Sequence, residues 1–228
     1  MLAFLLIFGF LYHGSVWIRI QKTNNYKINM KTITLITLFV GALAFITNAY
    51  ASVSGNLGVT TDYLWRGSSQ ANGTSVSGGL DYAGEGYYAG IWTSSLGGSG
   101  ESETDFYVGT DINGFDVGLI AYEYSAAGTD LDFQEYYVGY NYQGFDLFYA
   151  VNVDNSDADY FSVSYGLPTI IEGVSSTLTY GDSGAPDAAG NGTAEDYLQL
   201  DIAYGDLTLT VLDTDEGTST ALSYGWSL

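Results

Sequence analysis

Six aspartates recur inside stretches of alternating apolar and polar residues, and each stands on the polar side of its stretch. A carboxylate can accept hydrogen bonds, hold a cation or exchange a proton, but an unpaired one is costly to bury in a dry interior. This many on one kind of face predicts an interior that contains water or bound cations. The six are Asp81, Asp105, Asp111, Asp116, Asp146 and Asp201.

The charge balance gives this interior a sign. All 26 acidic residues of the chain lie within residues 52–228, where the single basic residue is Arg66, so the formal charge of this part is −25. Binding to phosphates needs Lys and Arg, which excludes nucleic acid as a partner. A wall of carboxylates favours small cations over anions. The alternative is that the acidic residues only hydrate a plugged barrel with a structural role.

Catalysis has few candidate groups. Residues 52–228 contain no Cys, His or Met, which removes thiolates, imidazole bases and nearly all zinc chemistry. We therefore expect no enzyme, no cofactor and no metal centre, with a carboxylate-pair hydrolase as the enzymatic alternative. The acidic segments 154–159 and 213–216 resemble calcium loops in composition, but neither completes the twelve-residue pattern, and we expect solvated loops.

The first 51 residues are a leader by their pattern. Residues 30–51 combine Lys31, an apolar stretch and a small-x-small site ending at Ala51, which predicts a signal peptide cleaved there. A membrane helix is the alternative. Residues 1–29 form an N-terminal extension that translation from Met30 would leave out, the other possibility being a genuine helix. Residues 52–228 then form one domain.

The elements that must position the aspartates are strands, because side chains of one face recur with period two. We predict twelve strands in an all-β, antiparallel, up-and-down transmembrane β-barrel. Their ranges are 53–64, 74–83, 87–96, 103–112, 115–124, 132–142, 145–153, 158–167, 173–181, 195–204, 207–213 and 218–227.

The links between these strands favour a barrel over a soluble sandwich. Every second link is short and mostly a tight Gly turn, whereas the others are longer on average and rich in Gly, Ser, Asn and Asp. Outer-membrane barrels have short periplasmic turns and long external loops. Strands of about ten residues, tilted by about 40°, also rise by about 25 Å, the height of the apolar band of such barrels.

Arg66 is the one cation available to these carboxylates. Asp62, four residues earlier, shares its face if the first strand continues that far, so we expect an ion pair there. Arg66 could in this way pin the first long loop into the mouth of the barrel. An ordinary ion pair with a stack on Trp65 or a Tyr is the alternative.

The segment around Arg66 resembles the start of the TorF family, bacterial outer-membrane proteins classed as porins. The matching motif consists of Asp62, Tyr63, Trp65, Arg66, Gly67, Ser69 and Gln70, and segments 78–82 and 86–92 continue it. The resemblance implies an outer-membrane barrel with a transport role and carries no catalytic motif.

We therefore expect a protein of the bacterial outer membrane that contacts lipid and lets small solutes or cations diffuse passively through a narrow acidic barrel. The alternative is a secreted, acidic β-sandwich with an adhesive or structural role and calcium as a candidate ligand.

Overall fold

The computed structural model describes residues 52–71, 73–97, 100–125, 132–155, 158–183 and 196–228. The predicted extension 1–29 and signal peptide 30–51 lie outside these residues. In the part of the chain that is described, no helix has the length and apolar character needed to cross a membrane.

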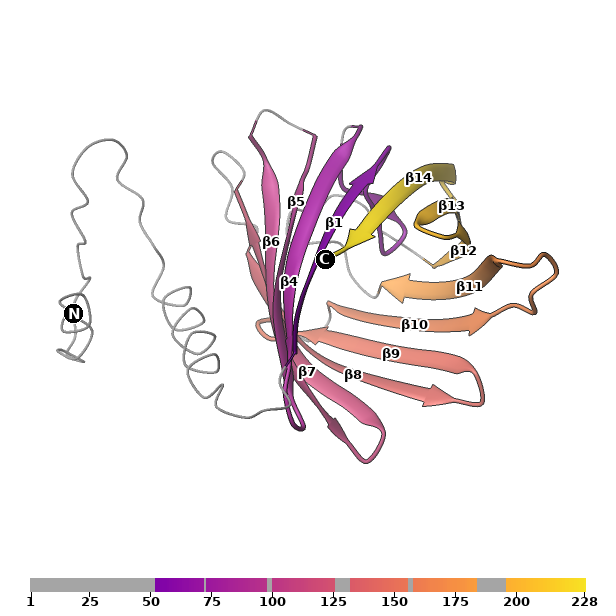
Figure 1. Cartoon of the computed structure of the whole chain (residues 1–228). Helices are drawn as coiled ribbons and strands as arrows, with labels where there is room; N and C mark the ends of the chain where they lie inside the picture. Colours follow the sequence, from indigo (N-terminus) through magenta and orange to yellow (C-terminus); the bar gives the residue numbers. More distant parts are fainter. Residues whose placement is uncertain (1–51, 72, 98–99, 126–131, 156–157, 184–195) are drawn as a thin grey trace, which may run out of the picture.

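Twelve antiparallel strands form a closed barrel, which confirms the predicted all-β architecture (Figure 1). Consecutive strands pair with one another, and the first strand closes the ring against the last, so the alternative of a two-sheet sandwich is wrong. The barrel strands are β1 (Ser52–Thr60), β4 (Ser75–Ala83), β5 (Tyr88–Ser95), β6 (Ser102–Ile112), β7 (Phe115–Tyr124), β8 (Phe133–Tyr142), β9 (Phe145–Asn152), β10 (Asp159–Gly166), β11 (Val174–Ser183), β12 (Tyr197–Tyr204), β13 (Leu207–Thr214) and β14 (Gly217–Ser227).

The two ends of the barrel differ in their links. The start of β1, the end of β14 and the turns Asn113-Gly114 and Gln143-Gly144 lie at one end, here called the turn end. All four turn residues have positive φ, from 53° to 87°, as in the tight hairpin turns that match strand twist. The opposite end, the loop end, carries most of the longer links. One predicted long link is in fact tight, because Thr214 pairs directly with Gly217.

The predicted first strand is too long. Strand β1 ends at Thr60 rather than at residue 64, and the chain then forms a small separate hairpin of β2 (Leu64–Trp65) and β3 (Ser68–Ser69). Its turn is Arg66-Gly67, with φ of 46° and 82°, the same two-residue geometry as the turns above. The strand prediction missed it because Tyr63 falls on the same side of the alternation as Leu57 and Val59 of β1.

The inner face is identified by contacts between strands that are not neighbours. The hydroxyl groups of Tyr88 on β5 and Tyr137 on β8 form a hydrogen bond, although β6 and β7 lie between these strands in the wall. Such a contact is possible only inside the barrel. The strand registers then assign every other strand position to the inner or the outer face.

The outer face is apolar over its middle. Large exposed side chains such as Leu80, Leu198 and Leu222 point outward, each more than 40% accessible. Exposed apolar surface on this scale marks a membrane or an interface. The outward acidic residues of the described strands all stand near the loop end: Glu123, Asp159, Asp182 and Asp213. This distribution fits an outer-membrane barrel.

Candidate functional site: the plugged lumen

Residues 61–71, here called the plug, fold back into the loop end of the barrel. Their shape depends on internal hydrogen bonds. The Ser69 hydroxyl donates to Asp62 Oδ1 at 2.6 Å, and the backbone N–H of Gln70 donates to the backbone carbonyl of Tyr63 at 2.7 Å. Asp62 therefore braces the plug instead of pairing with Arg66, contrary to the sequence prediction. The strand that would have placed the two side chains on one face ends at Thr60.

Arg66, at the tip of the plug, binds Glu135 on β8. Its two terminal nitrogens donate to the two Glu135 carboxylate oxygens at 2.7 and 2.8 Å, and the side chains are 11% and 4% exposed. The guanidinium also lies 4.4 Å from the Trp65 ring centroid and 4.1 Å from that of Tyr160 on β10. Burial lowers the pKa of Arg66, but the hydrogen bond with Glu135 and the electrostatic influence of Tyr122, Glu135 and Tyr160 together outweigh this and raise that pKa above its ordinary value.

The rest of the plug contacts the walls on either side of this ion pair. Tyr63 meets Trp92 on β5 edge to face at 5.5 Å, and its hydroxyl donates to Glu103 Oε1 on β6 at 3.4 Å. Trp65 packs on Tyr122 of β7 at 5.6 Å. Arg66 thus combines the two predicted alternatives: it holds the first long loop in the mouth of the barrel, and it does so by an ion pair together with contacts to the Trp65 and Tyr160 rings.

The far side of the plug is apolar. Leu64 packs against a buried cluster of Ala150, Tyr160, Tyr197 and Leu212, which comes from four different strands. A Cβ atom at Gly67 would lie 3.0 Å from the Tyr197 ring, so the turn approaches that wall closely. The plug therefore contacts both sides of the lumen.

All six predicted aspartates fall on the inner face by strand register. Five lie toward the turn end and bind neutral donors. Asp81 accepts from the Tyr107 hydroxyl, and Asp116 accepts from the Tyr88 hydroxyl at 2.6 Å. These phenols offset the loss of hydration of the two carboxylates.

The other three aspartates of the turn end also have donors. Asp146 accepts from the Asn141 amide at 2.6 Å, and Asp201 accepts from the Thr210 hydroxyl at 2.6 Å. Asp111 accepts from the backbone amide of the Gly114 turn at 3.0 Å, directly beside the rim. Among the predicted six, Asp105 alone lies beneath the plug.

A layer of tyrosines crosses the inner wall between these aspartates. The Tyr107 ring lies over Gly90 of the neighbouring strand, and the Tyr137 ring lies over Gly118, so a Cβ at either glycine would overlap the ring. Sequence reasoning missed this pairing, although inward tyrosines opposite glycines are visible once the strand register is known.

Two buried acidic residues that contact the plug were missed as well. Glu103 and Glu135 are 1% and 3% exposed. Glu103 stands on the polar side of the predicted strand 103–112, so the alternation could have found it. Glu135 shares its side of the predicted strand 132–142 with Phe133 and Tyr137, so the alternation carried no such signal there.

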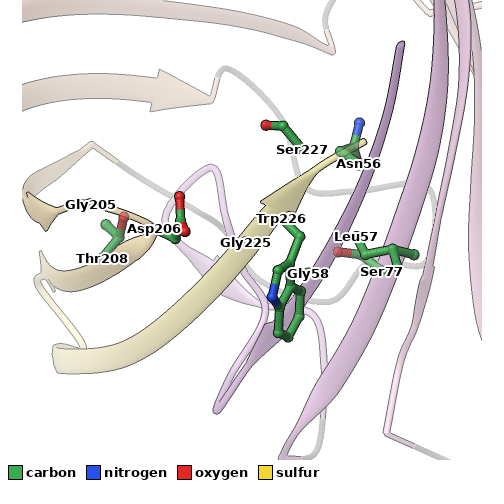
Figure 2. A pocket seen from close by; sticks show the side chains of 10 residues that line it. All are labelled: Asn56, Leu57, Gly58, Ser77, Gly205, Asp206, Thr208, Gly225, Trp226 and Ser227. Carbon is green, nitrogen blue, oxygen red and sulfur yellow. The ribbon is translucent and has the colours of Figure 1, made fainter.

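A shallow hollow of about 370 Å³ lies at the seam between β1 and β14 (Figure 2). Gly58 and Gly225 pair there and contribute no side chain, while Asn56, Ser77 and Thr208 line the hollow with polar groups. It is an open recess of the lumen near the turn end.

The described residues contain no group of three or more His, Cys, Asp or Glu placed to hold a metal ion. In the predicted calcium-like segment 213–216, Asp213 accepts from the Thr218 hydroxyl at 2.7 Å across the tight turn. The segment 154–159 is only partly within the described residues.

Residues 46–214 match the sequence pattern of a family described as "Bacterial protein of unknown function (Gcw_chp)". The chain belongs to this family. No curated protein matches the chain. Among solved structures, one from work described as "Unveiling the Mechanism Behind the in-meso Crystallization of Membrane Proteins" is similar, with a TM-score of 0.44 and 10% identity over 77% of this chain and 83% of that chain. The membership of the chain in the Gcw_chp family rests on the sequence pattern alone.

Proposed function

We propose that this Gcw_chp protein is an outer-membrane porin of the TorF type, through which small cations and small neutral solutes diffuse passively. The turn end faces the periplasm and the loop end faces outward in this proposal, as short and long links do in bacterial barrels. The apolar outer face contacts lipid. Twelve strands enclose more space than the eight that side chains just fill, and less than the sixteen to eighteen of general porins.

The observation that carries the proposal is the imbalance of charge on the inner wall. Six aspartates, Glu103 and Glu135 face inward, and Arg66 is the single basic residue of residues 52–228. The charge of Arg66 is already offset by Glu135 at 2.7 Å. The remaining carboxylates attract cations and repel anions.

The plug sets the size of what can pass. It occupies the loop end and contacts both sides of the lumen, whereas the hollow beside Asn56 leaves room toward the turn end. We propose a wide, wet entrance on the periplasmic side and a constriction at the plug.

Planar bilayers with a salt gradient test the function. We expect a small conductance with a reversal potential that favours cations, and a lower cation preference in the triple variant Asp81→Asn, Asp116→Asn, Asp201→Asn. The double substitution Arg66→Ala, Glu135→Ala removes the ion pair without leaving one charge unpaired. It should release the plug and raise the conductance. Anion preference, or no conductance in this double variant, would contradict the proposal.

A further inference from the structure

Two acidic residues beneath the plug keep buried oxygen atoms without a hydrogen-bond partner. Glu103 and Asp105 stand two positions apart on β6, point inward, and are 1% and 8% exposed. Glu103 Oε2 and Asp105 Oδ1 are the two buried side-chain atoms of the described residues that lack a partner. Unsatisfied buried polar atoms are rare in native structures, and each calls for an explanation.

The two side chains stand on the same inner face of β6, two positions apart. Ionised carboxylates are acceptors only, so each unpartnered oxygen needs either a proton or a cation. Arg66 does not fill this role, because both of its terminal nitrogens donate to Glu135. No other Arg, Lys or His exists in residues 52–228.

The groups around the pair are hard oxygen donors. The Tyr63 hydroxyl of the plug lies 3.4 Å from Glu103 Oε1. Carboxylate, phenol and water oxygens suit calcium, whereas nitrogen and sulfur ligands would suit transition metals. Two carboxylates with the balance supplied by water resemble the weaker calcium sites of extracellular modules, with Kd of about 10⁻⁴–10⁻³ M.

We propose that Glu103 and Asp105 bind one calcium ion against the inner wall, beside Tyr63 of the plug. The ion neutralises two carboxylates to which Arg66 donates no hydrogen bond, because its terminal nitrogens are bonded to Glu135. Because Tyr63 is hydrogen-bonded to Glu103 and meets Trp92 edge to face, the bound ion also steadies the plug at β5 and β6. Arg66 and Glu135 hold the plug at β8, so calcium provides a second attachment. This inference does not rest on the proposed function, since it needs no conduction.

Terbium is a suitable probe, because Trp92 pairs with Asp105 across β5 and β6 and can sensitise Tb³⁺ bound there. We expect Tb³⁺ titration of the purified barrel, with excitation of tryptophan, to give emission that millimolar Ca²⁺ displaces. Glu103→Gln and Asp105→Asn should each weaken Tb³⁺ binding at least tenfold. Asp146→Asn is the matched control, since it removes an inward charge near the turn end, and it should leave the titration unchanged.

A second readout keeps the test decisive if an acidic variant fails to fold. Arg66 is the single trypsin site of residues 52–228, so the cleavage rate there reports how firmly the plug is seated. Ca²⁺ should slow this cleavage several-fold in the unaltered protein. The variant Trp92→Phe retains both carboxylates, so Ca²⁺ should slow its cleavage as well, although it should lose most of the terbium emission. Absence of Ca²⁺ protection, or emission that Glu103→Gln and Asp105→Asn leave unaltered, overturns the proposal, and a shared proton then joins the two carboxylates.

Discussion

The two halves of the lumen handle buried carboxylates in opposite ways. Toward the turn end, the acidic side chains bind neutral donors, such as the Tyr88 hydroxyl on Asp116 and the Thr210 hydroxyl on Asp201. Toward the loop end, Glu135 requires the charge of Arg66, and Glu103 and Asp105 keep oxygens unpartnered. The difference follows from burial, because Glu103, Asp105 and Glu135 are 1%, 8% and 3% exposed while Asp116 and Asp201 are only half-buried. A carboxylate near bulk water needs only neutral donors, whereas a deeply buried one needs an opposite charge.

Glu135→Ala should break this comparison most strongly. It leaves Arg66 buried without its counter-charge, a loss of about 3–5 kcal/mol for a pair of this burial. The plug should leave its seat, and trypsin should cut after Arg66 at least a hundredfold faster, as followed by gel electrophoresis and mass spectrometry. Glu135→Asp can keep one hydrogen bond, so its cleavage rate should lie between those of the unaltered protein and Glu135→Ala. Equal cleavage rates in all three proteins would mean that the ion pair does not hold the plug.

Gly118→Ala tests the wall of the turn half. The added Cβ would overlap the Tyr137 hydroxyl and also the Val108 carbonyl, which as backbone cannot move aside. We expect a loss of about 1–3 kcal/mol in unfolding free energy, measured by urea titration in detergent. Gly139→Ala on the next strand is the control, since its nearest neighbour would lie 3.5 Å away. Equal unfolding free energies for Gly118→Ala and Gly139→Ala would mean that the wall is not tightly packed at Gly118.

Gly67→Ala compares the turn of the plug with a turn of the wall. Gly67 has φ +82° and its Cβ would lie 3.0 Å from Tyr197, whereas Gly205 has φ +57° and open space around it. Both alanine variants meet the left-handed backbone penalty of about 1–2 kcal/mol, but only Gly67→Ala adds a close contact. Trypsin cleavage after Arg66 should therefore accelerate in Gly67→Ala and stay unchanged in Gly205→Ala.

Asp146→Asn should have the smallest effect. Asp146 is exposed near the turn end, and the Asn141 amide can still donate to the new carbonyl oxygen. We expect a change in stability within about 0.5 kcal/mol, as for most exposed substitutions. A loss above 2 kcal/mol by urea titration would show that the turn half is as dry as the loop half, and the comparison would fail.

The alternation of side chains predicted nearly all of the wall, because period two is a local property that survives without tertiary context. A first long loop held in the barrel mouth by Arg66 was anticipated, but the small hairpin within it was missed, although its turn Arg66-Gly67 is the same kind of two-residue turn as Asn113-Gly114. The partner of Arg66 was missed because it is distant in the sequence. Glu135 is 69 residues away, and no spacing rule connects the two until the barrel closes.

The seam between β1 and β14 has a consequence for how the protein assembles. It pairs five residues, Asn56–Thr60 with Ser223–Ser227, whereas the β1–β4 ladder pairs nine. Before the ring closes, both strands are free edges whose amides and carbonyls hydrocarbon cannot satisfy. On the proposal that the barrel spans a bilayer, an open sheet would leave these groups unsatisfied in lipid, so the five pairs of the seam are what turns an open sheet into a sealed one.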